Sequence, residues 1–246
     1  MQRKNMASVS SRIAVGLAGI LCAFALLVGC AQQPQATGTE QQVEQRQGNS
    51  TSAEGEQERA DALAKGRLEE AKPLEPAITK DLQAAEDDQV RLDGLDFRFK
   101  SQESLARKII SDAHEKGVSL DEAAAQINDV LRYTIRIEPS VYVSKATEYL
   151  KTLEAKGYSV VKFKNMWNGD IYKGVNTQIE APTGFVFELQ VHTPDSLAMR
   201  EKTHKYYEIS RDEKSTKEEV DDAVRTMTEL VKELEIPEGA LEFTWE

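Results

Sequence analysis

The sequence has 246 residues, of which 31 are basic and 42 acidic, and its formal net charge at pH 7 is −11. A chain this acidic lacks the broad basic surface that nucleic acids require, so we expect no nucleic-acid partner. The only two cysteines are at positions 22 and 30, which excludes a cysteine nucleophile or a thiolate metal site after residue 30.

The first thirty residues have the layout of a secretory signal peptide. Basic residues at positions 3, 4 and 12 accompany an apolar run over residues 13–28, and no acidic residue is present. The run ends in Leu26-Leu27-Val28-Gly29-Cys30, which resembles the lipobox at which bacterial lipoproteins are cleaved and diacylated on the cysteine. The alternative is an uncleaved anchor helix, although the run is shorter than the roughly 20 residues that span a bilayer. Either way we expect an exported chain at the cell membrane, lipid-anchored at Cys30 in the first case.

Composition divides the remaining chain into four parts. Residues 31–52 are rich in Gln, Gly, Ser, Thr and Glu, which predicts a disordered tether. Residues 53–89 are strongly charged with scattered Leu and Ala, which suggests a linker of marginal helices. The compact domain is expected over residues 90–236, followed by a tail at 237–246.

Helices and strands alternate in the first half of the compact domain. Apolar spacing predicts a helix over 103–116 that is closed by Gly117. Ser119 and Glu122 form a capping box for a short Ala-rich helix that leads to Val130. Alternating residues 131–137 predict a strand, followed by a helix over 142–156 and a second strand over 158–163.

A β-hairpin is predicted around the turn residues at 182–184. A three-residue loop places Gln178 opposite Glu188 and Asn176 opposite Gln190, so the polar positions of both strands share one face. Thr193 and Pro194 then begin a helix that runs to about residue 211, and a capping box over 215–218 opens a last helix. We therefore expect an α/β (α+β) domain with a mixed sheet flanked by helices.

Glu188 is the most informative single residue of this hairpin. A carboxylate between two apolar strand residues is unfavourable to bury unless a cation faces it. Asp129 is the second candidate carboxylate, and two carboxylates with phosphate oxygens are a usual Mg²⁺ site. The alternative is a solvent-facing edge strand on which Glu188 forms a salt bridge.

An ordered set of segments over about residues 90–211 resembles the synthetase domain of the RelA/SpoT family, which has a nucleotidyltransferase-like fold. The segments are Phe97–Ser101, Ser104–Lys108, Asp129 before a strand, Tyr172–Thr177, Glu188–Thr193, and His204 with Tyr206 and Tyr207. In the family's Asp-x-x-Gly-x-Arg pattern, this chain has Arg132 in place of the glycine and Thr134 in place of the arginine. The family usually has arginine where this chain has His192.

The resemblance implies a pyrophosphokinase that transfers the β,γ-pyrophosphate of ATP to the 3′-hydroxyl of a guanine or adenine nucleotide. It implies that Asp129 and Glu188 hold Mg²⁺ and act in catalysis, with Glu188 also as the base. Further roles are implied for ATP binding by Arg98, Lys100 and Lys108, and for acceptor binding by Tyr172, Lys173, Asn176, Gln190 and His192. The alternative is an inactive surface lipoprotein that only binds a nucleotide or a partner protein.

Overall fold

The computed structural model describes residues 39–212 and 214–245, of which residues 39–52 are described by their backbone alone. The predicted signal peptide, Cys30 and the first part of the predicted tether lie outside the described residues. Residues 45–246 belong to one compact unit. In the part of the chain that is described, no helix has the length and hydrophobicity needed to cross a membrane.

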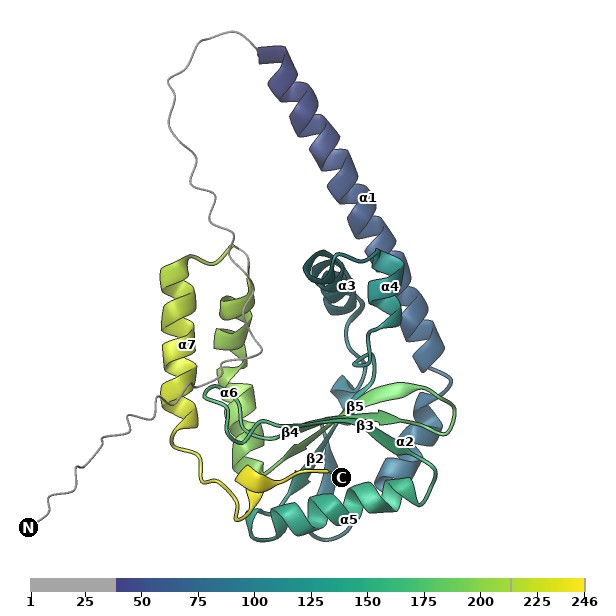
Figure 1. Cartoon of the computed structure of the whole chain (residues 1–246), viewed down its shortest axis with the longest axis vertical. Helices are drawn as coiled ribbons and strands as arrows, with labels where there is room; N and C mark the ends of the chain where they lie inside the picture. Colours follow the sequence, from purple (N-terminus) through teal and green to yellow (C-terminus); the bar gives the residue numbers. More distant parts are fainter. Residues whose placement is uncertain (1–38, 213, 246) are drawn as a thin grey trace, which may run out of the picture. The chain divides into compact units, whose positions relative to one another are not determined.

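A mixed five-stranded sheet, in the order β1-β2-β5-β4-β3, forms the centre of this α+β unit (Figure 1). Strands β2 and β5 are parallel, and the other neighbours are antiparallel. The strands are β1 Val90–Asp93, β2 Arg132–Ile137, β3 Ser159–Asn165, β4 Val175–Glu180 and β5 Val186–His192. The predicted mixed sheet with flanking helices is therefore confirmed.

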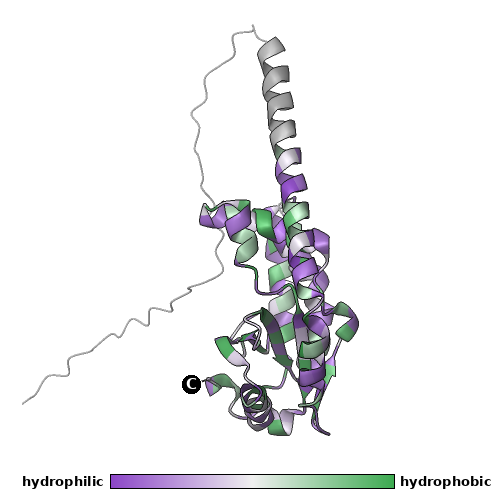
Figure 2. Ribbon diagram, turned by 90° about the vertical axis from the view of Figure 1, so that its right-hand side faces the viewer, coloured by the Kyte–Doolittle hydropathy of each residue, from purple (hydrophilic) through white to green (hydrophobic). Residues whose placement is uncertain are grey.

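Helices α2 (Glu75–Gln83) and α5 (Tyr142–Glu154) cover the apolar face of the sheet. Strand alternation puts the side chains of Tyr133, Ile135, Phe187 and Leu189 on this face, where each is at most 1% exposed. The Tyr142 hydroxyl donates a hydrogen bond to a backbone carbonyl of β5, which fixes α5 against the sheet. Figure 2 shows this concentration of hydrophobic residues in the strands. Burial of this face stabilises the unit.

A second layer of helices stands on the other side of the sheet: α1 (Thr39–Ala71), α3 (Gln102–Lys116) and α4 (Leu120–Ala125). Ala60 and Ala64 of α1 are fully buried in the same apolar cluster as Ile109 of α3. Arg67 also donates to the carbonyl oxygen of Ile127, in the loop after α4. The helices predicted over residues 53–89 are present, but the prediction that they form a marginal linker is wrong, because α1 and α2 contribute residues to the core. The predicted tether is also partly helical, since α1 begins at Thr39.

The C-terminal part is a helical hairpin of α6 (Pro194–Arg211) and α7 (Lys217–Val231). Thr193 caps α6, as the sequence predicts, and Ser119 and Glu122 form the predicted capping box of α4. The cap of α7 is one residue later than predicted, since Thr216 bonds to Glu219. Residues 240–242 form a 3₁₀ turn within the predicted tail, and Phe243 is buried, so the core extends beyond residue 236.

Candidate active site

The second face of the sheet is polar. Gln178 is the cross-strand partner of Glu188, and Asn176 is the partner of Gln190, as the predicted loop requires. Strand β5 lies between β2 and β4, so Glu188 is on a central strand and the interpretation of an edge strand is wrong. Among the described residues, Glu188 forms no salt bridge. A mid-strand carboxylate on an interior strand is therefore present without the ion pair that would make it structural.

Asp129 and Glu188, which are 59 positions apart in the sequence, come together on this face. Leu131 accepts a hydrogen bond from the backbone N–H of Glu188 at 3.0 Å, so the segment that carries Asp129 runs directly beside β5. Burial raises the pKa of Glu188, the hydrogen bond from Gln190 opposes that rise, and the charge of Asp129 adds to it. The two carboxyl groups are thus close enough to affect each other's ionisation.

Lys100 is the cation bound to Asp129. Its Nζ donates to Asp129 Oδ2 at 2.7 Å, and the two side chains are 13% and 21% exposed. Burial opposes ionisation of Asp129, but the charge and hydrogen bond of Lys100 outweigh it and hold the pKa of Asp129 below its ordinary value. Burial also lowers the pKa of Lys100, although Asp129 opposes that change. Asp129 is therefore an ionised carboxylate at neutral pH.

The carboxylate pair fits a divalent cation that is completed by substrate. Within the described part of the chain, no three His, Cys, Asp or Glu side chains gather into a site made of protein ligands alone. The Oδ1 atom of Asp129, however, is buried without a hydrogen-bond partner. A buried carboxylate oxygen without a partner is unfavourable, and Mg²⁺ commonly takes one or two carboxylates plus phosphate oxygens and water. The donor set therefore suits Mg²⁺ that is bound together with a polyphosphate.

The other two residues predicted to bind ATP differ in their surroundings. Lys108 lies 3.5 Å from Asp112 on its own helix, and its charge also lowers the pKa of Asp129, which places it near the carboxylates. Arg98 donates from Nε to Glu75 of α2 at 2.6 Å and from Nη1 to the carbonyl oxygen of Leu95 at 2.6 Å. The structure brings Lys100 and Lys108 towards Asp129, whereas Arg98 is occupied by α2.

Three of the residues predicted to bind the acceptor form one hydrogen-bonded chain. The Tyr172 hydroxyl donates to Asn176 Oδ1 at 2.7 Å and lies 2.9 Å from His192 Nε2. The opposite ring nitrogen, His192 Nδ1, is 2.9 Å from Ser196 Oγ in the first turn of α6. A neutral imidazole has one donor nitrogen and one acceptor nitrogen, so it can bond to a hydroxyl group at each. The neutral imidazole therefore satisfies both neighbours.

Burial keeps this imidazole neutral. His192 is fully buried, and burial together with the charge of Arg200 lowers its pKa to about 3. Burial likewise raises the pKa of Tyr172 above its ordinary value. Gly174 has φ of +150°, and a Cβ there would approach within 2.9 Å of the His192 ring, so glycine allows the close contact.

The other two residues predicted to bind the acceptor, Gln190 and Lys173, lie outside this hydrogen-bonded group. Gln190 donates to Glu188 Oε1 and has a buried Oε1 without a partner. Lys173 donates to the carbonyl oxygen of Trp167 at 2.7 Å, and burial lowers the pKa of its ammonium group. Trp167 is fully buried and packs edge-on against Tyr142, which makes it a core residue.

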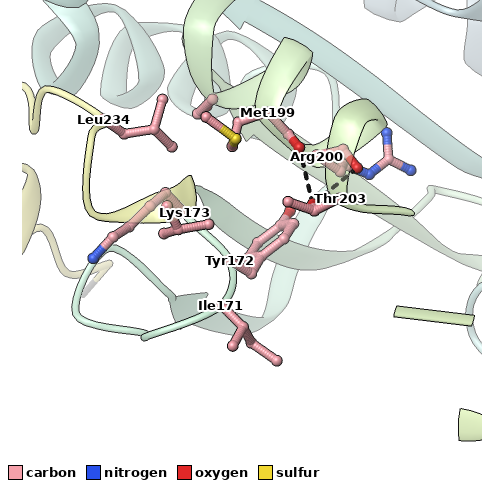
Figure 3. Close-up of a pocket in the computed structure, with 9 residues that line it drawn as sticks. Ile171, Tyr172, Lys173, Met199, Arg200, Thr203 and Leu234 are labelled. Atoms are coloured by element: carbon pink, nitrogen blue, oxygen red, sulfur yellow. Dashed lines mark hydrogen bonds between the residues drawn. The ribbon is translucent and has the colours of Figure 1, made fainter. Parts of the chain in front are cut away.

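A small pocket lies beside the tyrosine, between the hairpin of α6 and α7 and the loop before β4 (Figure 3). Figure 3 shows Tyr172 between the ammonium group of Lys173 and the guanidinium group of Arg200, which point in opposite directions. No sequence pattern indicates that Arg200 and Ser196 lie here, because they reach the site only through the packing of α6 against the sheet. Arg132 stands in place of the glycine in the family's Asp-x-x-Gly-x-Arg pattern. No feature of the sequence indicates that it is the cross-strand partner of Glu188.

No protein-family model matches the sequence, and no curated protein is significantly similar to it. Solved structures with a similar arrangement include the small alarmone synthetase 1 of Bacillus subtilis, with 17% identity, TM-score 0.44, and coverage of 71% of this chain and 88% of that one. A GTP pyrophosphokinase family protein of Streptococcus pneumoniae has 13% identity and TM-score 0.41, with coverage of 72% and 89%. The type VI effector Tas1, solved with its immunity protein, has 21% identity and TM-score 0.38, with coverage of 72% and 96%. TM-scores below 0.5 do not place the chain in a family, so the function is inferred from the geometry of the site.

Proposed function

We propose that this chain is a Mg²⁺-dependent nucleotide pyrophosphokinase that transfers the β,γ-pyrophosphate of ATP to the 3′-hydroxyl of a guanine or adenine nucleotide. The observation that carries the proposal is the pairing of Asp129 with Glu188 on the polar sheet face, beside Lys100 and with a buried carboxylate oxygen that lacks a partner. The sequence resemblance to RelA/SpoT synthetases, seen in the same residues, supports the choice of reaction.

Glu188 is suited to act as the general base. Its raised pKa makes the carboxylate a stronger proton acceptor than an exposed glutamate. In the proposed reaction the acceptor's 3′-oxygen forms a bond to the β-phosphorus of ATP as its proton passes to Glu188. The bond between the β-phosphorus and the oxygen that bridges the α- and β-phosphates breaks, and AMP leaves with that oxygen.

The other residues of this face hold charge and position. Lys100 neutralises negative charge on the phosphates, and Asp129 with Glu188 would hold Mg²⁺, which supplies further charge neutralisation when bound. The gap between the pKa values of the two carboxyl groups separates their roles, since Asp129 stays ionised and Glu188 titrates at higher pH. Tyr172 is proposed to contact the acceptor base, with its hydroxyl oriented by Asn176 and His192.

The test is incubation of the purified chain with labelled ATP, Mg²⁺ and a panel of guanine and adenine nucleotides, with separation of the products. We expect AMP and a 3′-pyrophosphorylated nucleotide in equal amounts from the wild type, and far less of both from Glu188→Gln. Failure of every nucleotide to accept pyrophosphate would refute the proposal.

A second candidate function, nucleotide binding without transfer, is favoured by one observation. Lys100 already occupies one oxygen of Asp129, and this reduces the negative charge available to a metal ion. Equally tight binding of ATP by the wild type and Glu188→Gln, with no AMP formed by either, would select this candidate.

We further propose that the chain is exported and anchored in the cell membrane through a lipid on Cys30. The support is the sequence alone: the basic start, the apolar run and the five residues that end at Cys30. Growth with labelled palmitate should label the wild type and Cys22→Ser but not Cys30→Ser. Cys22 is a matched control because it lies inside the apolar run. Equal labelling of wild type and Cys30→Ser would contradict the anchor.

A further inference from the structure

Arg132 is a cation beside both carboxylates. It is the first residue of β2, and its Cα pairs with that of Glu188 across the parallel ladder. Its Nε is buried without a hydrogen-bond partner, and among the described residues its guanidinium group forms no salt bridge. A partly buried guanidinium without an acceptor is an unfavourable arrangement that an anion would relieve.

The surroundings of Arg132 direct that anion to a particular place. Strand alternation puts Arg132 on the polar face with Glu188, opposite the buried Tyr133. Its positive charge acts on Asp129, Glu188 and Lys100, since it lowers the pKa of all three. Arg132 and Lys100 thus form a pair of cations around the two carboxylates.

Arg98, the arginine that the sequence resemblance assigns to ATP, is held elsewhere. Its bond to Glu75 is short, and Glu75 also accepts a hydrogen bond from Thr79, so the three side chains form a network with α2. Moving Arg98 to a phosphate would leave Glu75, which is 9% exposed, without its cation. Within the described part of the chain, Arg132 has no such competing partner.

We propose that Arg132 is a phosphate ligand and that, with Lys100, it receives the triphosphate of the donor nucleotide. The inference rests on the proposed function and refines it, because it replaces Arg98 by Arg132 in the donor subsite. Two donors of one guanidinium group can bond to two phosphate oxygens at once, which fixes the phosphate relative to Asp129 and Glu188 as well as binding it.

The test is calorimetric titration of the full chain with a non-hydrolysable ATP analogue plus Mg²⁺, and separately with inorganic tripolyphosphate. Arg132→Met keeps most of the apolar stem of the side chain and removes its charge. We expect it to weaken binding of both ligands roughly 10- to 100-fold, the range for loss of a charge-assisted hydrogen bond. Arg132→Lys should recover part of the affinity, because it restores the charge but not the two parallel N–H donors of a guanidinium group.

Arg136→Met is the matched control, because Arg136 lies on the same strand and face but pairs with Asp93 at 3.3 Å. It should bind both ligands as the wild type does, and circular dichroism should show all variants folded. Wild-type affinity in Arg132→Met would overturn the inference even if the wild type transfers pyrophosphate. Binding of tripolyphosphate that depends on Arg132, in a chain that forms no AMP, would support the phosphate site while refuting the pyrophosphokinase.

Discussion

The polar face of the sheet has two ends that differ in how well their polar atoms are satisfied. At the carboxylate end, Asp129 Oδ1, Arg132 Nε and Gln190 Oε1 are buried without hydrogen-bond partners. At the histidine end, the Tyr172 hydroxyl and both ring nitrogens of His192 have partners within 2.9 Å. Folded proteins rarely leave buried polar atoms unpaired without a reason, and a ligand is one such reason. The difference supports the proposal that the first end receives a ligand, whereas the second end holds its own geometry.

The largest expected effect is at the carboxylate end. Glu188→Gln should lower the rate of pyrophosphate transfer roughly 100- to 10,000-fold, the usual contribution of a general base. The same change should stabilise the fold at neutral pH. Because burial raises the pKa of Glu188 in the folded state, its contribution to stability is complete at acid pH and is lost as the pH rises through the folded pKa.

Urea unfolding at several pH values measures this second effect. The gain in unfolding free energy of Glu188→Gln over the wild type should grow between acid and neutral pH. Loss of activity accompanied by loss of stability at pH 7 would show that Glu188 is a structural residue.

The next largest effect concerns the salt bridge at the same end. Lys100→Met leaves the mostly buried Asp129 carboxylate without its cation and should destabilise the fold by about 3 kcal/mol, as for other broken buried pairs. Adding Asp129→Asn should restore part of that loss. Lys217→Met is the control, since its pair with Asp221 is exposed and should contribute at most about 1 kcal/mol. Equal effects at positions 100 and 217 would show that the carboxylate end is as open to water as the surface.

A smaller effect tests the packing of α1 on the helices above this face. Ala64 is fully buried, so Ala64→Leu should overpack the contact and destabilise the fold by about 1–3 kcal/mol in urea unfolding. Ala62→Leu, at an exposed position of the same helix, should change stability little. If both substitutions were neutral, α1 would not be part of the core.

The last effect belongs to the histidine end and is seen only at acid pH. His192 has a folded pKa of about 3, below its unfolded value, so its contribution to stability is present above about pH 6.5 and is lost as the pH falls. Over that range this one group should decrease the unfolding free energy by about 1.4 kcal/mol per pH unit. His192→Gln should flatten the acid limb of a stability–pH curve and leave its slope above pH 7 unchanged. An identical acid limb in the variant would show that His192 is protonated in the folded protein.

The polar face was predictable because it depends on local rules. Strand alternation and the three-residue loop at 182–184 were enough to set Gln178 against Glu188. The cap of α7 shows the limit of such rules, since residues 215–218 and 216–219 both fit the capping pattern and only the structure selects Thr216. Local patterns identify the elements more reliably than their first residues.

The long-range contacts could not be predicted in the same way. The core role of α1 is carried by Ala60, Ala64 and Ala71, small residues that permit close helix packing but give a weak hydrophobic pattern. The partner of Arg98 is Glu75, which lies in the stretch that was predicted to be a linker. The pairing of Arg132 with Glu188 requires the parallel association of β2 and β5, which no spacing in the sequence specifies.

The most direct measurement is an experimental structure of the chain with Mg²⁺ and a non-hydrolysable ATP analogue. We predict the triphosphate at the carboxylate end, in contact with Lys100 and Arg132 and sharing the metal ion with Asp129 and Glu188, while the bonds between Tyr172 and His192 stay as they are. A nucleotide bound elsewhere, or at this face without contact to either carboxylate, would contradict the assignment of this end as the site of transfer.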